Sequence, residues 1–197
     1  MPKPYNPNDK YAKRAKNEGY RARSVYKLQQ LDSRYHLLQP GLNVLDLAAA
    51  PGSWLQWIVE KVGTTGKVVG VDLQPIQSIE GAQTFVTDII DTIAMDQIIK
   101  DTDLSPIDLI TSDIAPSTSG MPGRDHALSI ELNQAIVEVA RKYLRDRGNL
   151  VMKVFDGVEL VNFRKQLEGD FARILVTKVQ ASRDRSSELY IVCLNKK

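Results

Sequence analysis

The chain has 197 residues, 43% of them hydrophobic and 25% charged, which is enough for one sizeable core and indicates a single domain. One cysteine, Cys193, excludes an internal disulfide framework and a cysteine-rich zinc site, and two scattered histidines do not indicate a metal site. The polar first residues lack the apolar stretch of a secretory signal and no apolar run approaches ~18 residues, so we expect a cytoplasmic protein without a membrane span.

Positive charge is concentrated at the start of the chain. The first 30 residues carry eight lysines and arginines against two acids, a net charge of +6, which leaves −4 for the remaining residues of a chain whose formal net charge is +2. Such an asymmetry indicates a basic arm for an anionic partner such as a nucleic acid, although a solvated helix face would give the same pattern.

Two short helices are expected in this basic region. The first eight residues are expected to be extended, and residues 9–19 predict a basic helix that ends at Gly19. Ser24 is expected to cap a second helix that runs to about Arg34, with Val25, Leu28 and Leu31 on one face.

Strands and helices then alternate along the rest of the chain. The expected helices cover residues 53–62, 91–100, 126–147, where Gly148 would stop the helix, and 158–167. The expected strands cover residues 42–47, 67–73, 84–86, 107–112, 149–155, 171–179 and 188–194.

This order predicts an α/β fold. Strands joined through helices form a mostly parallel sheet with helices on both faces, because the crossover connections are right-handed. The last two strands have no helix between them and should form an antiparallel hairpin. No internal repeat or linker is visible, so we expect residues 1–197 to form one domain with a basic helical arm of about residues 1–35.

The loop after the first expected strand indicates a nucleoside ligand. In the segment VLDLAAAPGSW, residues 44–54, the small side chains let a ligand approach the backbone, and Gly52 can adopt angles closed to other residues. Asp72 ends the next strand, where a carboxylate can accept both ribose hydroxyls. The glycine pattern that binds a pyrophosphate is missing, which favours S-adenosylmethionine over a dinucleotide. The alternative is an ordinary tight loop.

Five further charged residues are candidates for the site, each with a structural alternative. Asp88, after the third strand, could accept from an adenine amine or cap a helix, and Asp113, after the fourth strand, could face the same crevice or serve a turn. Lys27 and Glu188 could each be a solvated charge. Lys153 differs because it lies in the apolar strand GNLVMKVFDG, where an unpaired ammonium group is costly.

Six motifs, in this order and spacing, resemble the RrmJ/FtsJ (RlmE) family of ribosomal RNA large-subunit ribose 2′-O-methyltransferases over roughly residues 8–195. The motifs are YRARSVYKL, LDLAAAPGSW, VDLQP, SDIAPSTSG, VMKVFDG and SSELYIV. The first loop reads AAAPGSW here where the family has GAAPGGW, and it keeps Pro51, Gly52 and Trp54. The resemblance implies a seven-stranded, Rossmann-like class I methyltransferase fold that uses S-adenosylmethionine and no metal.

The resemblance also implies the site residues. The family's catalytic Lys-Asp-Lys-Glu tetrad maps, with no member missing, onto Lys27, Asp113, Lys153 and Glu188. The cofactor contacts map onto Gly52, Ser53, Trp54, Asp72, Leu73, Asp88, Ile89 and Asp113. During methyl transfer to a ribose hydroxyl, Lys153 would be either a neutral base for that hydroxyl or a charged group that orients it. The sequence does not decide between these roles.

The implied reaction is 2′-O-methylation of a ribose, expected to be that of a uridine, in large-subunit ribosomal RNA. Methylation of the tRNA anticodon loop is the alternative, because YRARSVYKLQQL and AAAPGSW also resemble those enzymes, whereas the later motifs and an end at Lys197 favour ribosomal RNA. We expect a monomer whose arm binds RNA phosphates through Lys13, Arg14, Lys16, Arg21 and Arg23, with Arg183 and Arg185 adding to them. A nicotinamide-dependent oxidoreductase, which would need the missing glycine pattern, and a non-catalytic RNA-binding module, which would not need the tetrad, are the competing classes.

Overall fold

A computed structural model describes residues 9–182 and 186–197 of the chain. The helices are α1 (Lys10–Asn17), α2 (Val25–Tyr35), α3 (Ser53–Val62), the short 3₁₀ helix η1 (Gly63–Thr65), α4 (Thr92–Asp101), α5 (Pro122–Tyr143) and α6 (Leu160–Leu167). The strands are β1 (Asn43–Leu47), β2 (Lys67–Asp72), β3 (Gln83–Val86), β4 (Ile107–Ser112), β5 (Leu144–Phe155), β6 (Phe171–Thr177) and β7 (Glu188–Lys196).

The seven strands form one sheet in the order β3-β2-β1-β4-β5-β7-β6. Strands β1 to β5 are joined by parallel pairings, whereas β7 runs antiparallel to both β5 and β6, so the expected mostly parallel sheet with an antiparallel hairpin is confirmed. β7 lies between its hairpin partner and β5, which brings Glu188 opposite Phe155 and Tyr190 opposite Lys153.

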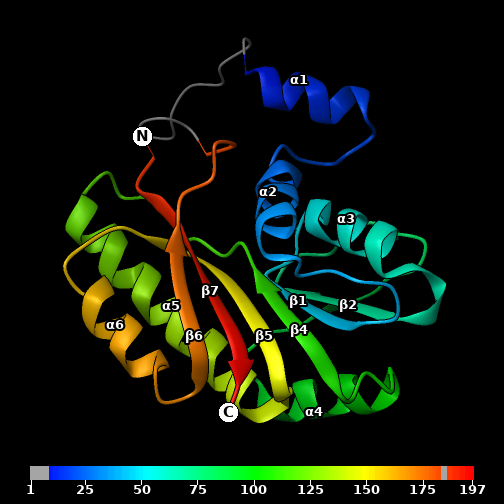
Figure 1. Cartoon of the computed structure of the whole chain (residues 1–197). Coiled ribbons are helices and arrows are strands. Elements are labelled where there is room, and N and C mark those ends of the chain that lie inside the picture. The colour runs from blue at the N-terminus through cyan, green and yellow to red at the C-terminus, as the bar shows by residue number, and fades with distance from the viewer. Residues whose placement is uncertain (1–8, 183–185) are drawn as a thin grey trace.

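Helices cover both faces of the sheet (Figure 1). On one face, here called the α2–α3 face, Leu28 and Leu31 of α2 pack with Leu55 and Ile58 of α3 against alternate residues of the central strands. On the other face, α4, α5 and α6 pack against the intervening residues and form the larger core. Neighbouring residues of a strand therefore point into different cores, and every second residue faces α2 and α3.

The expected boundaries of the helix before β5 are wrong at both ends. α5 begins at Pro122, a residue favoured in the first helical turn, and ends at Tyr143 because Leu144 has an extended backbone. Gly148 is therefore not the helix stop. It lies within β5, in the stretch where pairing with β4 shifts register, and a Cβ there would lie 2.8 Å from the main-chain oxygen of Arg145.

The chain before the sheet follows the expectation with one correction. Asp9 caps α1, and Gly19, with a φ of +80°, follows its end. Ser24 is at the start of α2 but makes no side-chain capping bond, because its hydroxyl pairs with that of Ser53 at 2.8 Å. None of the helices in the described parts of the chain has the length and apolar character that crossing a membrane requires.

Candidate active site

The carboxyl ends of β4 and β5 and the start of β7 meet at one edge of the sheet, on the α2–α3 face. Val151 and Val192 belong to the core on this face. Lys153, two residues after Val151, and Tyr190, two residues before Val192, therefore point to the same face. Asp113 follows the last residue of β4, and Glu188 opens β7. Lys27 reaches this group from α2, which packs on this face of the sheet.

The four residues of the expected tetrad form one contiguous cluster. Lys27 Nζ donates to Glu188 Oε2 at 2.9 Å and lies 3.9 Å from Asp113 Oδ1. Lys153 Nζ lies 3.1 Å from the same Asp113 oxygen and also donates to the main-chain oxygen of Asp113. Both lysine side chains are buried, at 10% and 7% exposure, and each has an acid beside it. The ammonium group within the apolar strand β5 is therefore paired.

The charge of Glu188 is fixed by its neighbours. Burial raises the pKa of this carboxyl, but the charges of Lys27 and Lys153 and the hydrogen bond from Lys27 outweigh burial, so its pKa lies below the ordinary value. Glu188 is consequently an ionised acceptor at neutral pH, and it holds Lys27 in place beside Asp113.

Tyr190 belongs to this cluster, and sequence reasoning missed it. Its side chain is fully buried, and its hydroxyl donates to Asp113 Oδ1 at 2.8 Å. Burial, followed by the charges of Asp113 and Glu188, raises the pKa of Tyr190 well above its ordinary value, so the phenol keeps its proton and remains a donor. The motif SSELYIV held a signal, because a residue two positions after Glu188 in a strand faces the same side.

The loop between β1 and α3 has an unusual backbone. Ala48 and Gly52 both have positive φ, at 56° and 99°. A Cβ on Gly52 would lie 2.8 Å from Ile79 and 2.9 Å from the guanidinium of Arg21, so this position needs glycine. Gly52 also occupies the cap position of α3 without a side-chain cap, which leaves the first N–H groups of that helix available to an anionic group.

Two acids flank this loop at the ends of neighbouring strands. Asp72, the last residue of β2, accepts from the backbone N–H of Ala50 at 2.8 Å and of Gln74 at 2.8 Å, and so it ties the two loops together. Asp88 lies two residues beyond the end of β3 and accepts from the N–H of Ile90 at 3.2 Å. Asp88 does not cap α4, because Asp91 does.

The remaining expected cofactor residues differ in what their side chains do. Ser53 bonds to Ser24, and Trp54 is 3% exposed and donates its indole N–H to the Ser24 main-chain oxygen at 2.9 Å. These two side chains therefore fasten α3 to α2 and leave only backbone groups for a ligand. Leu73 is 69% exposed next to Asp72, whereas Ile89 packs against the larger core, which α4, α5 and α6 cover.

A third carboxyl, Asp46, is buried in β1 beneath the loop. Its Oδ1 accepts from the Thr111 hydroxyl at 2.6 Å, and its Oδ2 has no partner among the described residues. Burial raises the pKa of Asp46 to about 8, and the nearby charges of Asp113 and Asp72 act in the same direction. The group is thus mainly protonated at neutral pH, and it adds little negative charge to an edge that already holds several acids.

Arg21 joins the N-terminal arm to the loops of the site. Its guanidinium donates to the main-chain oxygens of Pro51 at 2.9 Å, Gln77 at 2.8 Å and Ser78 at 2.9 Å. Its backbone N–H donates to Gln56 Oε1 at 2.9 Å. Most of its donors are therefore used within the protein, and the expectation that Arg21 holds RNA phosphates does not fit this geometry.

Arg23 is also engaged internally, in an ion pair with Asp9 and a hydrogen bond to the main-chain oxygen of Ala181. Of the other expected phosphate ligands, Arg14 pairs with Glu18, while Lys13 and Lys16 are exposed. Arg183 and Arg185 lie outside the described residues. Fewer basic side chains of the arm are thus available to an anionic partner than the count of basic residues suggests.

His126 supports the segment that follows Lys153. Its Nδ1 donates to the Phe155 main-chain oxygen at 2.8 Å, and its Nε2 lies 3.1 Å from both the backbone nitrogen and the Oε2 of Glu159. Gly157 leaves room for this ring, because a Cβ at Gly157 would overlap it. Within the described residues no group of three or more His, Cys, Asp or Glu side chains could hold a metal ion.

Comparison with known proteins gives a consistent result. Residues 20–196 match the family described as FtsJ-like methyltransferase. The chain is 41% identical over 186 residues to "Ribosomal RNA large subunit methyltransferase E" of Nitrosopumilus maritimus, covering 94% of each protein. It is 42% identical over 193 residues to the protein of the same name from Halobacterium salinarum, covering 96% of this chain and 74% of the relative. A crystal structure described as a ribosomal RNA methyltransferase of Plasmodium falciparum superposes with a TM-score of 0.80 at 28% identity, covering 90% of this chain and 98% of the other.

Proposed function

The chain belongs to the FtsJ-like methyltransferase family, and from this premise we propose that it transfers a methyl group from S-adenosylmethionine to the 2′-oxygen of a ribose in large-subunit ribosomal RNA. The names of its relatives support this substrate. The observation that carries the proposal is the Lys27–Asp113–Lys153–Glu188 cluster, which lies at the carboxyl ends of the strands, where open α/β sheets bind their ligands.

The residues around the β1–α3 loop fit S-adenosylmethionine. The uncapped start of α3 offers backbone N–H groups to a carboxylate, and the carboxylates of Asp72 and Asp88 can accept from ribose hydroxyls and an adenine amine. The exposed side chain of Leu73 offers an apolar surface for a base next to Asp72. When bound, this cofactor supplies an electrophilic methyl group on its sulfonium.

The cluster would hold the ribose for attack on that methyl group. Fixing the 2′-oxygen in line with the departing sulfur supplies much of the acceleration in such a transfer. Asp113 is the centre of the cluster, because it contacts Lys27, Lys153 and Tyr190 at once. We assign Lys27, Glu188 and Tyr190 to positioning and Lys153 to the reacting hydroxyl.

We propose that Lys153 acts as an ammonium group. It is the cation nearest the Asp113 carboxylate, and its charged form leaves that partly buried acid compensated. An ammonium group has three donors: one bonds to the main-chain oxygen of Asp113, and a second can serve the ion pair with Asp113 Oδ1 at 3.1 Å. The third donor can orient the 2′-oxygen and stabilise the negative charge that develops on it.

The decisive experiment measures transfer of a radioactive methyl group to large ribosomal subunits, naked ribosomal RNA and tRNA, with the modified nucleotide mapped. We expect label in large-subunit ribosomal RNA at a 2′-oxygen, in a uridine, and strongly reduced labelling with Lys153→Ala, which should still bind the cofactor. Label confined to tRNA, or near wild-type methylation by Lys153→Ala, would contradict the proposal.

Lys153→Arg tests the role of the charge. Arginine keeps a positive charge but cannot act as a base. We expect Lys153→Arg to retain a measurable fraction of the single-turnover rate, whereas Lys153→Ala should lose about 10²–10³-fold, as removal of one electrostatic stabiliser does elsewhere. If Lys153→Arg binds both substrates normally and is as inactive as Lys153→Ala, the neutral-base role is correct.

The finer aspects of the proposal concern partner, assembly and place of action. We propose one compact domain that works as a monomer in the cytoplasm, where its ribosomal substrate lies. The arm of about residues 1–35 would contact the RNA backbone through the exposed Lys10, Lys13 and Lys16. Such contacts position RNA without reading its sequence and weaken as salt rises.

A further inference from the structure

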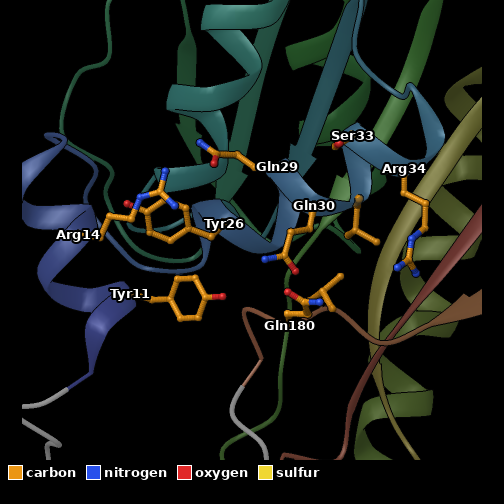
Figure 2. A pocket seen from close by; sticks show the side chains of 10 residues that line it. Tyr11, Arg14, Tyr26, Gln29, Gln30, Ser33, Arg34 and Gln180 are labelled. Carbon is orange, nitrogen blue, oxygen red and sulfur yellow. The ribbon is translucent and has the colours of Figure 1, made fainter.

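A groove of about 500 Å³ lies between α1, α2 and residues 179–180 after β6. Its volume is within the range of about 300–1,000 Å³ that is typical of ligand sites. Tyr11 and Arg14 of α1 form one wall, and Gln30 and Arg34 of α2 form the opposite wall. Gln180, in the segment after β6, also lines the groove. In Figure 2, Tyr11 projects from α1 toward Gln30 and Gln180.

The walls of the groove combine an aromatic ring, amides and positive charge. Tyr11 is partly exposed, and its ring lies 5.5 Å from that of Tyr26, with the charged groups of Lys10 and Arg23 at 5.4 and 5.3 Å from its centroid. Gln29, Gln30 and Gln180 supply amide donors and acceptors, Arg14 and Arg34 supply charge, and no acid is among the described residues that line the groove. Aromatic rings that stack on bases, together with cations that track the backbone, are the means by which proteins bind single-stranded nucleic acid.

The positive charge at the α2 wall is available to a ligand. Arg34 is exposed, and its guanidinium donates to the Thr177 hydroxyl at 2.7 Å. Within the described residues it has no carboxylate at ion-pair distance. Arg14 does pair with Glu18, but both side chains are well exposed, at 57% and 38%, so that pair is weak. The groove as a whole thus favours an anionic ligand.

The groove and the catalytic cluster share helix α2. Lys27 and Gln30 are three residues apart on this helix, which corresponds to about 4.5 Å along its axis. Gln30 also accepts from the backbone N–H of Ala181 at 3.2 Å, in the segment that leads to Glu188. The wall of the groove is thus linked to Lys27 along α2 and, through Ala181, to the segment that leads to Glu188.

We propose that this groove binds an unpaired nucleotide of the substrate RNA that flanks the methylated one, with its base against Tyr11 and its phosphate near Arg34. The inference rests on the proposed function, and it adds a specific nucleotide site to a surface from which only general phosphate contacts are expected. A neighbouring base held in the groove cannot stack on the target nucleotide, so this site would make the enzyme favour an unstacked target.

Steady-state methylation of a ribosomal RNA fragment by matched variants tests this site. Tyr11→Ala should raise the KM for RNA about tenfold, because one base–aromatic stack is lost, while kcat and the Kd for S-adenosylmethionine stay within about threefold. Tyr11→Phe keeps the ring and should behave as wild type. Arg34→Gln, which leaves the Tyr11 wall intact, should weaken RNA binding and lower the salt dependence by about one counterion.

Cross-linking locates the nucleotide directly. RNA with 4-thiouridine at positions next to the target should cross-link to the groove, with sites identified by mass spectrometry, and Tyr11→Ala should reduce that product. Equal RNA affinity in wild type, Tyr11→Ala and Arg34→Gln would overturn the proposal, as would cross-links only outside the groove. Binding of a free mononucleotide there with the affinity of the RNA would overturn the flanking assignment.

Wild-type activity separates this proposal from the one on which it rests. If the wild-type enzyme methylates the RNA and the variants do too with unchanged KM, only the groove assignment fails. If the wild-type enzyme methylates no RNA, the proposed function fails first. Because Tyr11 packs against the small cluster of Ala15, Val25, Tyr26 and Ala181, circular dichroism and cofactor binding of Tyr11→Ala verify that the arm stays folded.

Discussion

Arg21 holds together the two loops that flank the cofactor site, and its replacement should weaken cofactor binding in the absence of RNA. The guanidinium donates to one carbonyl before Gly52 and to two carbonyls in the loop after Asp72. Arg21→Ala removes all three bonds and leaves the backbone bond to Gln56 in place. The change therefore acts on loop geometry rather than on a residue expected to touch the cofactor.

The size of the effect follows from those three bonds. A hydrogen bond with a charged partner contributes about 1.5–3 kcal/mol when it is well protected. These bonds are exposed, and water replaces part of each one, so we take about 1.4 kcal/mol as the net loss of loop ordering for the set. If the competent loop conformation becomes about tenfold less populated, the apparent Kd for S-adenosylmethionine rises about tenfold.

Isothermal titration calorimetry of the cofactor without RNA measures this directly. Arg21→Lys is the informative partner variant, because lysine keeps the charge but cannot reach three carbonyls with a planar fork. We expect both Arg21→Ala and Arg21→Lys to weaken the cofactor Kd, and Lys16→Ala, an exposed charge on the same arm, to leave it unchanged. If Arg21→Ala binds the cofactor normally and loses only RNA affinity, while Arg21→Lys restores it, Arg21 is a phosphate ligand and the reasoning is refuted.

Two further predictions concern stability. Asp46 stays protonated in the folded chain up to about pH 8 but ionises near pH 4 when unfolded, so wild type should lose up to about 1.4 kcal/mol of unfolding free energy per pH unit between these values. Asp46→Asn should remove this loss, measured as the difference in unfolding free energy between urea titrations at pH 5 and pH 8. An equal loss in wild type and Asp46→Asn would contradict the prediction. Gly157→Ala should destabilise by about 1–3 kcal/mol, because its Cβ would overlap the His126 ring, whereas Gly123→Ala, with open space at the Cβ, should be neutral or stabilising; equal urea midpoints for the two variants would argue against this packing constraint.

Much of the fold, and the meeting of Lys27, Asp113, Lys153 and Glu188 at one edge of the sheet, could be predicted from the sequence, for a physical reason. Alternating strands and helices leave few topologies, and in a parallel sheet the carboxyl ends of the strands meet. A polar residue at such an end, such as Asp113 or Lys153, is then placed near the others without any knowledge of their contacts. The limit of α5 was missed because the apolar pattern continues through Leu144, which the backbone uses for β5.

The roles of the supporting residues depend on contacts made in the folded chain, which their local sequence does not show. Tyr190 resembles an ordinary strand tyrosine until β7 is known to pair with β5, which sets it opposite Lys153. Asp46 precedes a small-residue loop, and its burial depends on the helices that cover the strand. The acceptors of Arg21 are main-chain oxygens, which every residue has, so only the folded loops reveal its role.

Under the proposed function, the basic arm is part of the active site rather than an appendage to it. Along one short stretch of chain, Arg21 fixes the cofactor loops, Lys27 joins the catalytic cluster, and Gln30 with Arg34 forms a wall of the groove. If RNA in the groove orders this stretch, it also orders the clasp, meaning the three Arg21 hydrogen bonds that join the two loops. RNA and cofactor should then each raise the affinity of the protein for the other. Thermodynamic linkage requires the two factors to be equal, and loss of the clasp in Arg21→Ala should remove both together.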